Sequence, residues 1–149
     1  MPETFLVKNG RPVGAIMRDT RSDSPLLRQA EELIQRAARE VCQQNLPVLN
    51  YIELRESQRA KNAIAIGTEG YMRQIFGLGS EGADLGSEGF WIFPTSAANA
   101  TVTVVTGRTE QAVVRGVEYL VERLITKRGQ DLFVPSARVK GAPGKEDAG

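Results

Sequence analysis

A glycine-rich segment, residues 77–89, is the first stretch whose residue types and spacing could do chemistry. It contains the pattern Gly-x-Gly-x-x-Gly, which binds dinucleotides when it joins a strand to the start of a helix. The glycines are Gly77, Gly79 and Gly82, and the acidic residues are Glu81, Asp84 and Glu88. Here the pattern follows a predicted helix, and its carboxylates would repel phosphate. We interpret the segment as an acidic surface loop, with contact to a partner or ligand as the other interpretation.

Trp91 lies just after this loop, on a predicted strand. Its indole ring could stack on a sugar ring, but aromatic residues on strands more often pack in the core, which we favour. If the region does contact a ligand or a partner, the candidate residues are Glu81, Asp84, Glu88 and Trp91.

The composition excludes several kinds of catalytic site. The chain has 149 residues, no His and one Cys, which excludes Ser-His or Cys-His catalysis and a cysteine zinc cluster. Two carboxylate pairs, Glu31 with Glu32 and Glu118 with Glu122, could in principle act like the paired acids of a glycosidase. Nothing in the sequence gives either pair a reason to be buried. We therefore expect no catalytic residue, no metal and no cofactor in this chain.

The charge and hydropathy of the chain limit the classes of partner that it can bind. The formal net charge is +1 and 41% of the residues are hydrophobic, which is ordinary for a globular domain and too close to neutral for nonspecific nucleic-acid binding. No apolar stretch suits a signal peptide or approaches the roughly 20 residues of a membrane span. We expect a soluble chain of unknown compartment, with no nucleic-acid or membrane partner.

The apolar periodicity and the turn residues predict the order of elements. Asn9-Gly10 predicts a hairpin between the first two strands, and Ser24-Pro25 predicts the start of a long helix. Thr109 is expected to cap a second long helix that ends near Arg128, with Gly129 just beyond it. Strands are predicted at residues 5–7, 13–17, 48–54, 62–67, 90–93, 101–106 and 131–135, and helices at 25–42, 69–76 and from 109 onward.

These elements predict an α+β fold. We expect one domain over residues 1–135, with a mixed β-sheet and two long amphipathic helices packed on one face. Gly116, inside the second helix, predicts a close approach to a neighbouring segment. Residues 136–149 have the composition of a flexible tail or a linker to a further domain.

The last third of the chain carries motifs that resemble a known family. They are Gly89-Phe90-Trp91-Ile92, the strand from Thr101 to Gly107, the helical stretch 115–124 and Phe133-x-Pro135. With Ile64-Ala65-Ile66-Gly67 and the long helix before it, they resemble the small α+β domain that precedes the catalytic barrel in β-N-acetylhexosaminidases, α-glucuronidases and related glycoside hydrolases.

The resemblance implies a zincin-like, non-catalytic accessory domain, like the second domain of hexosaminidases, that supports a (β/α)8 catalytic barrel of the same polypeptide. A polysaccharide or oligosaccharide would then be met through the parent enzyme. Two alternatives stay open. One is a stand-alone carbohydrate-binding or oligomerisation module with the same fold, and the other is a small enzyme that uses carboxylates or a nucleotide.

Overall fold

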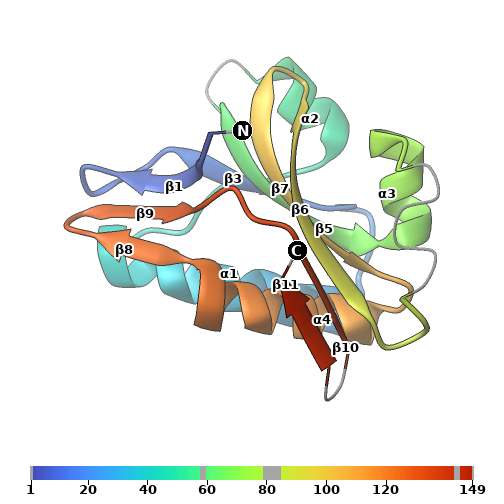
Figure 1. Ribbon diagram of the computed structural model, residues 1–149. Helices are drawn as coiled ribbons and strands as arrows, with labels where there is room; N and C mark the ends of the chain where they lie inside the picture. Colours follow the sequence, from blue (N-terminus) through green and yellow to red (C-terminus); the bar gives the residue numbers. More distant parts are fainter. Residues whose placement is uncertain (1, 58–59, 79–84, 143–144, 149) are drawn as a thin grey trace.

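The chain folds into two β-sheets, with helices on both sides of the larger one (Figure 1). The computed structural model describes residues 2–57, 60–78, 85–142 and 145–148. Over these residues the larger sheet has the strand order β11-β10-β6-β7-β5-β3-β4, and the smaller has the order β2-β1-β9-β8. The strands are β1 Thr4–Lys8, β2 Arg11–Pro12, β3 Gly14–Met17, β4 Val48–Leu49, β5 Asn62–Thr68, β6 Phe90–Ala97, β7 Ala100–Gly107, β8 Thr126–Arg128, β9 Asp131–Val134, β10 Val139–Ala142 and β11 Lys145–Ala148.

Different helices cover the two faces of the larger sheet. The helices are α1 Pro25–Cys42, α2 Tyr51–Glu56, α3 Glu69–Phe76, α4 Glu110–Tyr119 and the π-helix η1 Leu120–Leu124. Helices α1 and α4 share one buried apolar cluster with strand residues such as Ile64 and Val105. On the opposite face, Leu54 of α2 and Met72 of α3 belong to a cluster with Ala65. The alternation of side chains along each strand thus builds two cores, one on each face.

The expected mixed sheet is confirmed, but the second long helix is shorter than predicted. The α1 helix has the predicted bounds, and Ser24 Oγ accepts a hydrogen bond from the Leu27 N–H at 3.3 Å. The α4 helix begins at the predicted cap Thr109 but has 10 residues before the chain widens into η1. The close approach at Gly116 is confirmed, because a Cβ there would lie 2.7 Å from Val105 Cγ1.

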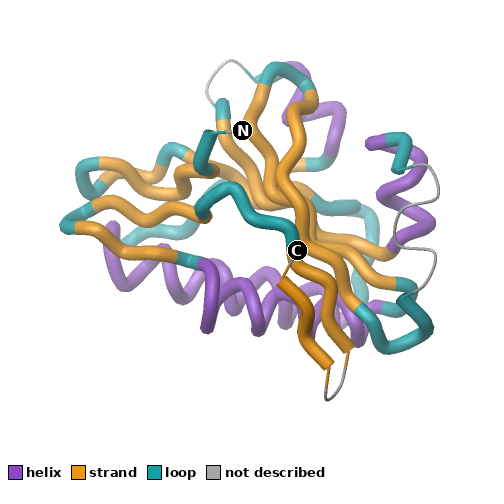
Figure 2. Tube along the Cα trace, in the orientation of Figure 1, coloured by secondary structure: helices purple, strands orange, loops and turns teal. Residues whose placement is uncertain are grey.

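The centre of the larger sheet is parallel. Strands β4, β3, β5 and β7 run in one direction, whereas β6 pairs antiparallel with β7. After β3 the chain passes through α1 to β4, which lies on one side of β3 in the strand order. After β5 it passes through α3 to β6 and β7, which lie on the other side. The strand order therefore reverses between β3 and β5. In Figure 2 helices, drawn in purple, lie on both sides of the larger sheet.

The predicted hairpin partner of the first strand is only partly correct. Asn9 and Gly10 form the turn, with φ of 54° and 76°. The return strand pairs with β1 only at Arg11 and Pro12, and β3 then joins the larger sheet. Where the chain passes from β2 to β3, Gly14 packs closely against β1, because a Cβ there would lie 2.5 Å from the carbonyl oxygen of Phe5.

The predicted strand at 48–54 is wrong beyond its first two residues. After β4, Asn50 Oδ1 accepts a hydrogen bond from the Glu53 N–H at 2.8 Å, and Glu53 Oε1 accepts one from the Asn50 N–H at 3.0 Å. This capping box starts α2, because it satisfies two backbone N–H groups that a helix start leaves unpaired.

The carboxyl-terminal part also differs from the prediction. Lys127 and Arg128 belong to β8 rather than to a helix end, and Gly129 lies in the turn to β9 with a φ of 61°. Val139–Ala142 forms β10 and pairs with β6, so this part of the expected tail belongs to the sheet. The division of the chain into a domain that ends at residue 135 and a linker stays a prediction.

Candidate functional site

The four residues predicted as ligand or partner contacts do not form a described cluster. Glu81 and Asp84 lie outside the described residues. The side chain of Glu88 is 63% exposed and lies 3.8 Å from Arg115. Trp91 is 3% exposed, its ring centroid is 4.1 Å from that of Phe93, and its ring is therefore packed in the core. Contact of these residues with a ligand or a partner stays a prediction.

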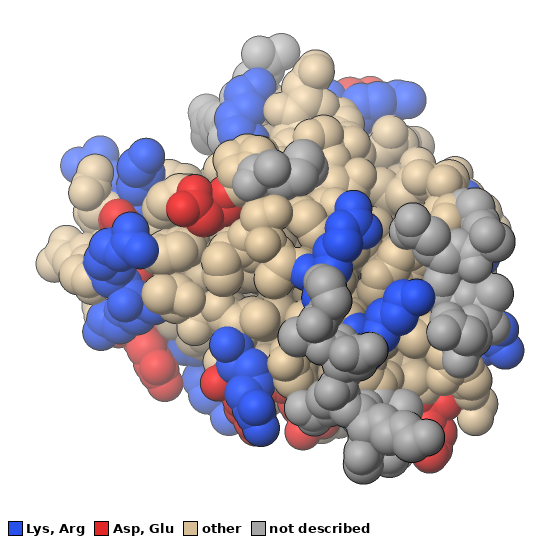
Figure 3. Space-filling model, in the orientation of Figure 1, with Lys and Arg blue, Asp and Glu red and all other residues tan. Residues whose placement is uncertain are grey.

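The end of the molecule formed by the smaller sheet carries several exposed cations, seen in blue at the left of Figure 3. Lys8 Nζ lies 5.0 Å from the centroid of the Phe5 ring, and Arg128 Cζ lies 4.9 Å from that of Phe133. The two rings are themselves 5.3 Å apart. These two cations are therefore held over an aromatic pair of the smaller sheet.

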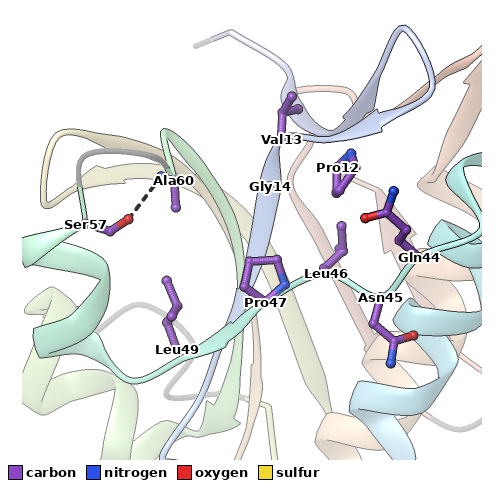
Figure 4. Close-up of a pocket in the computed structure, with 10 residues that line it drawn as sticks. All are labelled: Pro12, Val13, Gly14, Gln44, Asn45, Leu46, Pro47, Leu49, Ser57 and Ala60. Carbon is purple, nitrogen blue, oxygen red and sulfur yellow. Dashed lines mark hydrogen bonds between the residues drawn. The ribbon is translucent and has the colours of Figure 1, made fainter.

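A groove of about 560 Å³ lies at the amino ends of the parallel strands (Figure 4). It is lined by residues 12–14, 44–47 and 49, and by Ser57 and Ala60. Gln35 of α1 shapes one wall, because its amide donates to the Leu46 carbonyl at 2.9 Å and accepts from the Leu46 N–H at 2.6 Å. The described lining residues carry no ionisable side chain, so this part of the groove offers a ligand apolar surfaces and neutral polar groups.

Two adjoining pockets lie at the opposite edge, where the parallel strands end. One of about 110 Å³ lies between Gly67 and the starts of α1 and α4, and the other, of about 300 Å³, lies beside α2 and α3. They share two lining residues, Asp19 and Tyr71. They flank the reversal of strand order between β3 and β5, the place where open α/β sheets commonly bind ligands. We call these two pockets together the carboxyl-edge site.

Charged and polar groups surround Tyr71 in the carboxyl-edge site. Asp19 Oδ1 accepts hydrogen bonds from the Arg21 N–H at 3.0 Å and from Arg21 Nε at 3.4 Å. Burial, with the nearby Asp19 carboxylate, raises the pKa of the Tyr71 phenol above its ordinary value, and Arg21 acts in the opposite direction. The hydroxyl therefore stays protonated at neutral pH and can donate a hydrogen bond.

The other carboxylates at this edge hold the helix starts together. Ser24 Oγ donates to Glu110 Oε1 at 2.7 Å, which ties the start of α1 to that of α4. Glu69 pairs with Arg73 at 2.6 Å and with Arg108 at 3.5 Å. Within the described ranges, no group of three or more metal-ligating side chains is assembled. The described side chains at this edge therefore offer a ligand hydrogen-bonding groups and aromatic rings.

Sequence reasoning missed the carboxyl-edge site. Residues 19–24 lie between two predicted elements, and the strand predicted at 48–54 contains Tyr51. One signal was present, because Asn50 and Glu53 have the spacing of a capping box and place Tyr51 at the first position of a helix.

The structure defines a mixed α/β domain with pockets at both edges of its larger sheet, and one comparison identifies the family to which it belongs. Residues 15–119 match the family model described as the glycosyl hydrolase family 67 N-terminus. The chain therefore belongs to this family of glycoside hydrolase N-terminal domains, and the resemblance to such domains is confirmed. A search of the curated proteins finds no match. No helix of the described residues is long and apolar enough to cross a bilayer.

Proposed function

We propose that this chain is a non-catalytic accessory domain of an α-glucuronidase-type glycoside hydrolase, supporting a (β/α)8 barrel in the same polypeptide that carries the catalytic acids. The family match over residues 15–119 carries this proposal, because it runs from the second residue of β3 to the end of α4. The matched family fits the glucuronidase part of the resemblance, and no comparison supports the hexosaminidase part. The zincin-like arrangement of sheet and helices belongs to the same proposal.

The bonding of the carboxylates supports a non-catalytic role. A glycosidase needs two carboxyl groups that face each other across a substrate cleft, one of them kept protonated to act as the acid. Asp19 and Glu110 line the same small pocket, but each already accepts a hydrogen bond from a neighbouring residue, Arg21 and Ser24 respectively. Each carboxylate is thus engaged in holding the local backbone or helix start, which suits a structural acceptor better than a general acid.

A hydrolysis assay tests the proposal. The 149-residue chain is incubated with a set of 4-nitrophenyl glycosides that includes the α-glucuronide, and release of nitrophenol is compared with the buffer rate. We expect no turnover above buffer. Turnover that is lost in the Asp19→Asn and Glu110→Gln variants but kept in the exposed control Asp23→Asn would contradict a non-catalytic role and place the acids in this chain.

A further inference from the structure

The carboxyl-edge site has the size and place of a small-molecule site. Its larger pocket, of about 300 Å³, is at the lower end of the range of ligand pockets, roughly 300–1,000 Å³. The smaller pocket, of about 110 Å³, extends it across Asp19 and Tyr71 toward the helix starts. Together they open where the strand order reverses, so the loops after β3 and β5 diverge and leave a space between them.

Two tyrosine rings and an exposed aliphatic side chain give the larger pocket apolar surfaces. Tyr51 and Tyr71 are both half-buried, and Ile52 is 55% exposed. The Tyr71 ring lies against the strand at Gly67, where a Cβ would come within 3.0 Å of Tyr71 Cδ2. A ring fixed in this way can receive the apolar C–H face of a flat, partly hydroxylated ring at little entropic cost.

Several polar groups at the same pocket have unused hydrogen-bonding capacity. Among the described residues, the Tyr71 hydroxyl has no hydrogen-bond partner, and Asp19 uses only Oδ1. The Asn50 side chain uses its carbonyl oxygen in the capping box, so its amide donors remain available. Arg21 bonds Asp19 through Nε and keeps its two terminal nitrogens. Carboxylate, amide and guanidinium groups can each bind two neighbouring hydroxyls at once.

The charge of the site selects against anions. Its lining residues carry two carboxylates, Asp19 and Glu110, against the one guanidinium of Arg21. A phosphate or a uronate placed here would meet a net negative field in a partly buried pocket. An uncharged ligand with several hydroxyl groups would instead find both donors and acceptors.

We propose that the carboxyl-edge site binds one uncharged glycosyl unit of a neutral oligosaccharide. The sugar ring would lie against Tyr51 and Tyr71, and its hydroxyls would bond Asp19, Arg21, Asn50 and the Tyr71 hydroxyl. This inference rests on the proposed function, because it gives the accessory domain a substrate-holding role beside that of supporting the barrel. Binding by single hydrogen bonds and one or two ring contacts predicts a weak site, with a Kd of about 1 mM.

A titration followed by ¹H–¹⁵N NMR tests the site in the 149-residue chain. The probes are cellotetraose and xylotetraose as neutral oligosaccharides and tetragalacturonic acid as the anionic one. We expect saturable shifts from the neutral probes at residues 19–22, 50–52 and 67–71, and binding of the anionic probe at least about 10-fold weaker.

Matched variants distinguish binding at the carboxyl-edge site from nonspecific binding to the surface. Tyr71→Phe removes one hydroxyl and should weaken neutral binding about 3- to 10-fold, since one hydrogen bond contributes about 0.5–1.5 kcal/mol. Asp19→Asn should weaken neutral binding and narrow the difference between neutral and anionic probes. Asp23→Asn and Gln74→Ala, exposed residues that line neither pocket, should keep Kd within about 2-fold.

Three results would overturn the inference. The first is the absence of a saturable shift with either neutral probe at about 20 mM, well above the expected Kd. The second is a set of shifts that map to the groove of Figure 4. The third is equal binding of the anionic and the neutral probes. None of these bears on the proposed function, because an accessory domain without a sugar site would still lack turnover in the hydrolysis assay. Nitrophenol release by this chain would contradict the proposed function and leave the binding data standing.

Discussion

Replacing Gln35 by Met should destabilise the chain far more than its single amide suggests. Gln35 is 3% exposed and Leu46 is 2% exposed, and the Gln35 amide bonds both the N–H and the C=O of Leu46. Met has similar length but neither donor nor acceptor, so both backbone groups would be left buried without partners. Each such group costs about 1–3 kcal/mol, and allowing for partial relaxation of the loop we expect a loss of about 3 kcal/mol.

Urea unfolding of the two chains measures this loss, and thermal unfolding should show a fall in Tm of about 2–4 °C for each kcal/mol. Gln29→Met is the matched control, because Gln29 is exposed on the same helix; it should stay within about 0.5 kcal/mol of the parent chain. The Leu46 amide should also exchange with solvent faster in Gln35→Met. A Gln35→Met chain as stable as the control would refute the reasoning, and with it the view that this bond shapes the groove wall.

Three further predictions concern the cap, the core and the tyrosine. Asn50→Ala should lower the free energy of unfolding, measured in urea, by about 1 kcal/mol. Asn50→Asp should restore it, since aspartate but not alanine can accept the hydrogen bond from the Glu53 N–H. Equal losses of stability in the two variants would contradict the role of Asn50 as a cap. Gly116→Val should cost about 1–3 kcal/mol by overpacking against Val105, despite the poor helix propensity of glycine, and an unchanged urea midpoint would contradict the close approach. Because the Tyr71 pKa is raised in the fold, its contribution to stability should be complete below the unfolded pKa and lost as the pH rises through the folded one; in Tyr71→Phe this alkaline loss should be smaller and one tyrosinate step should vanish from the ultraviolet titration.

The elements that the sequence predicts well are those with strong local signals. The α1 helix combines a Ser-Pro start with a long apolar stripe, and the β6–β7 hairpin combines two β-branched or aromatic runs. In each case propensity, periodicity and capping agree, so tertiary context has little to change.

The wrong assignments arise where two signals compete. Residues 48–54 alternate like a strand, yet the Asn50–Glu53 capping box turns them into a helix after two strand residues. Gly129 follows basic residues like a helix end, but the same glycine suits a tight turn between β8 and β9, and the pairing of those strands decides the outcome.

The carboxyl-edge site could not be predicted because its residues come together only through the parallel topology. Asp19 follows β3, Tyr51 follows β4 and Tyr71 follows β5, so they meet once these strands lie side by side in one direction. The predicted mixed sheet did not specify which strands run parallel, and antiparallel neighbours would place these loops at opposite edges.

The central claim is that this chain is one domain of a longer glycoside hydrolase, and the size of the native polypeptide tests it most directly. An antibody raised against the chain, whose own mass is 16.3 kDa, would be used on an immunoblot of the source cells. A (β/α)8 barrel adds about 250 residues, so we predict a band at roughly 45 kDa or above. A single band at the mass of the chain itself would contradict the account, because no barrel could then be joined to this domain.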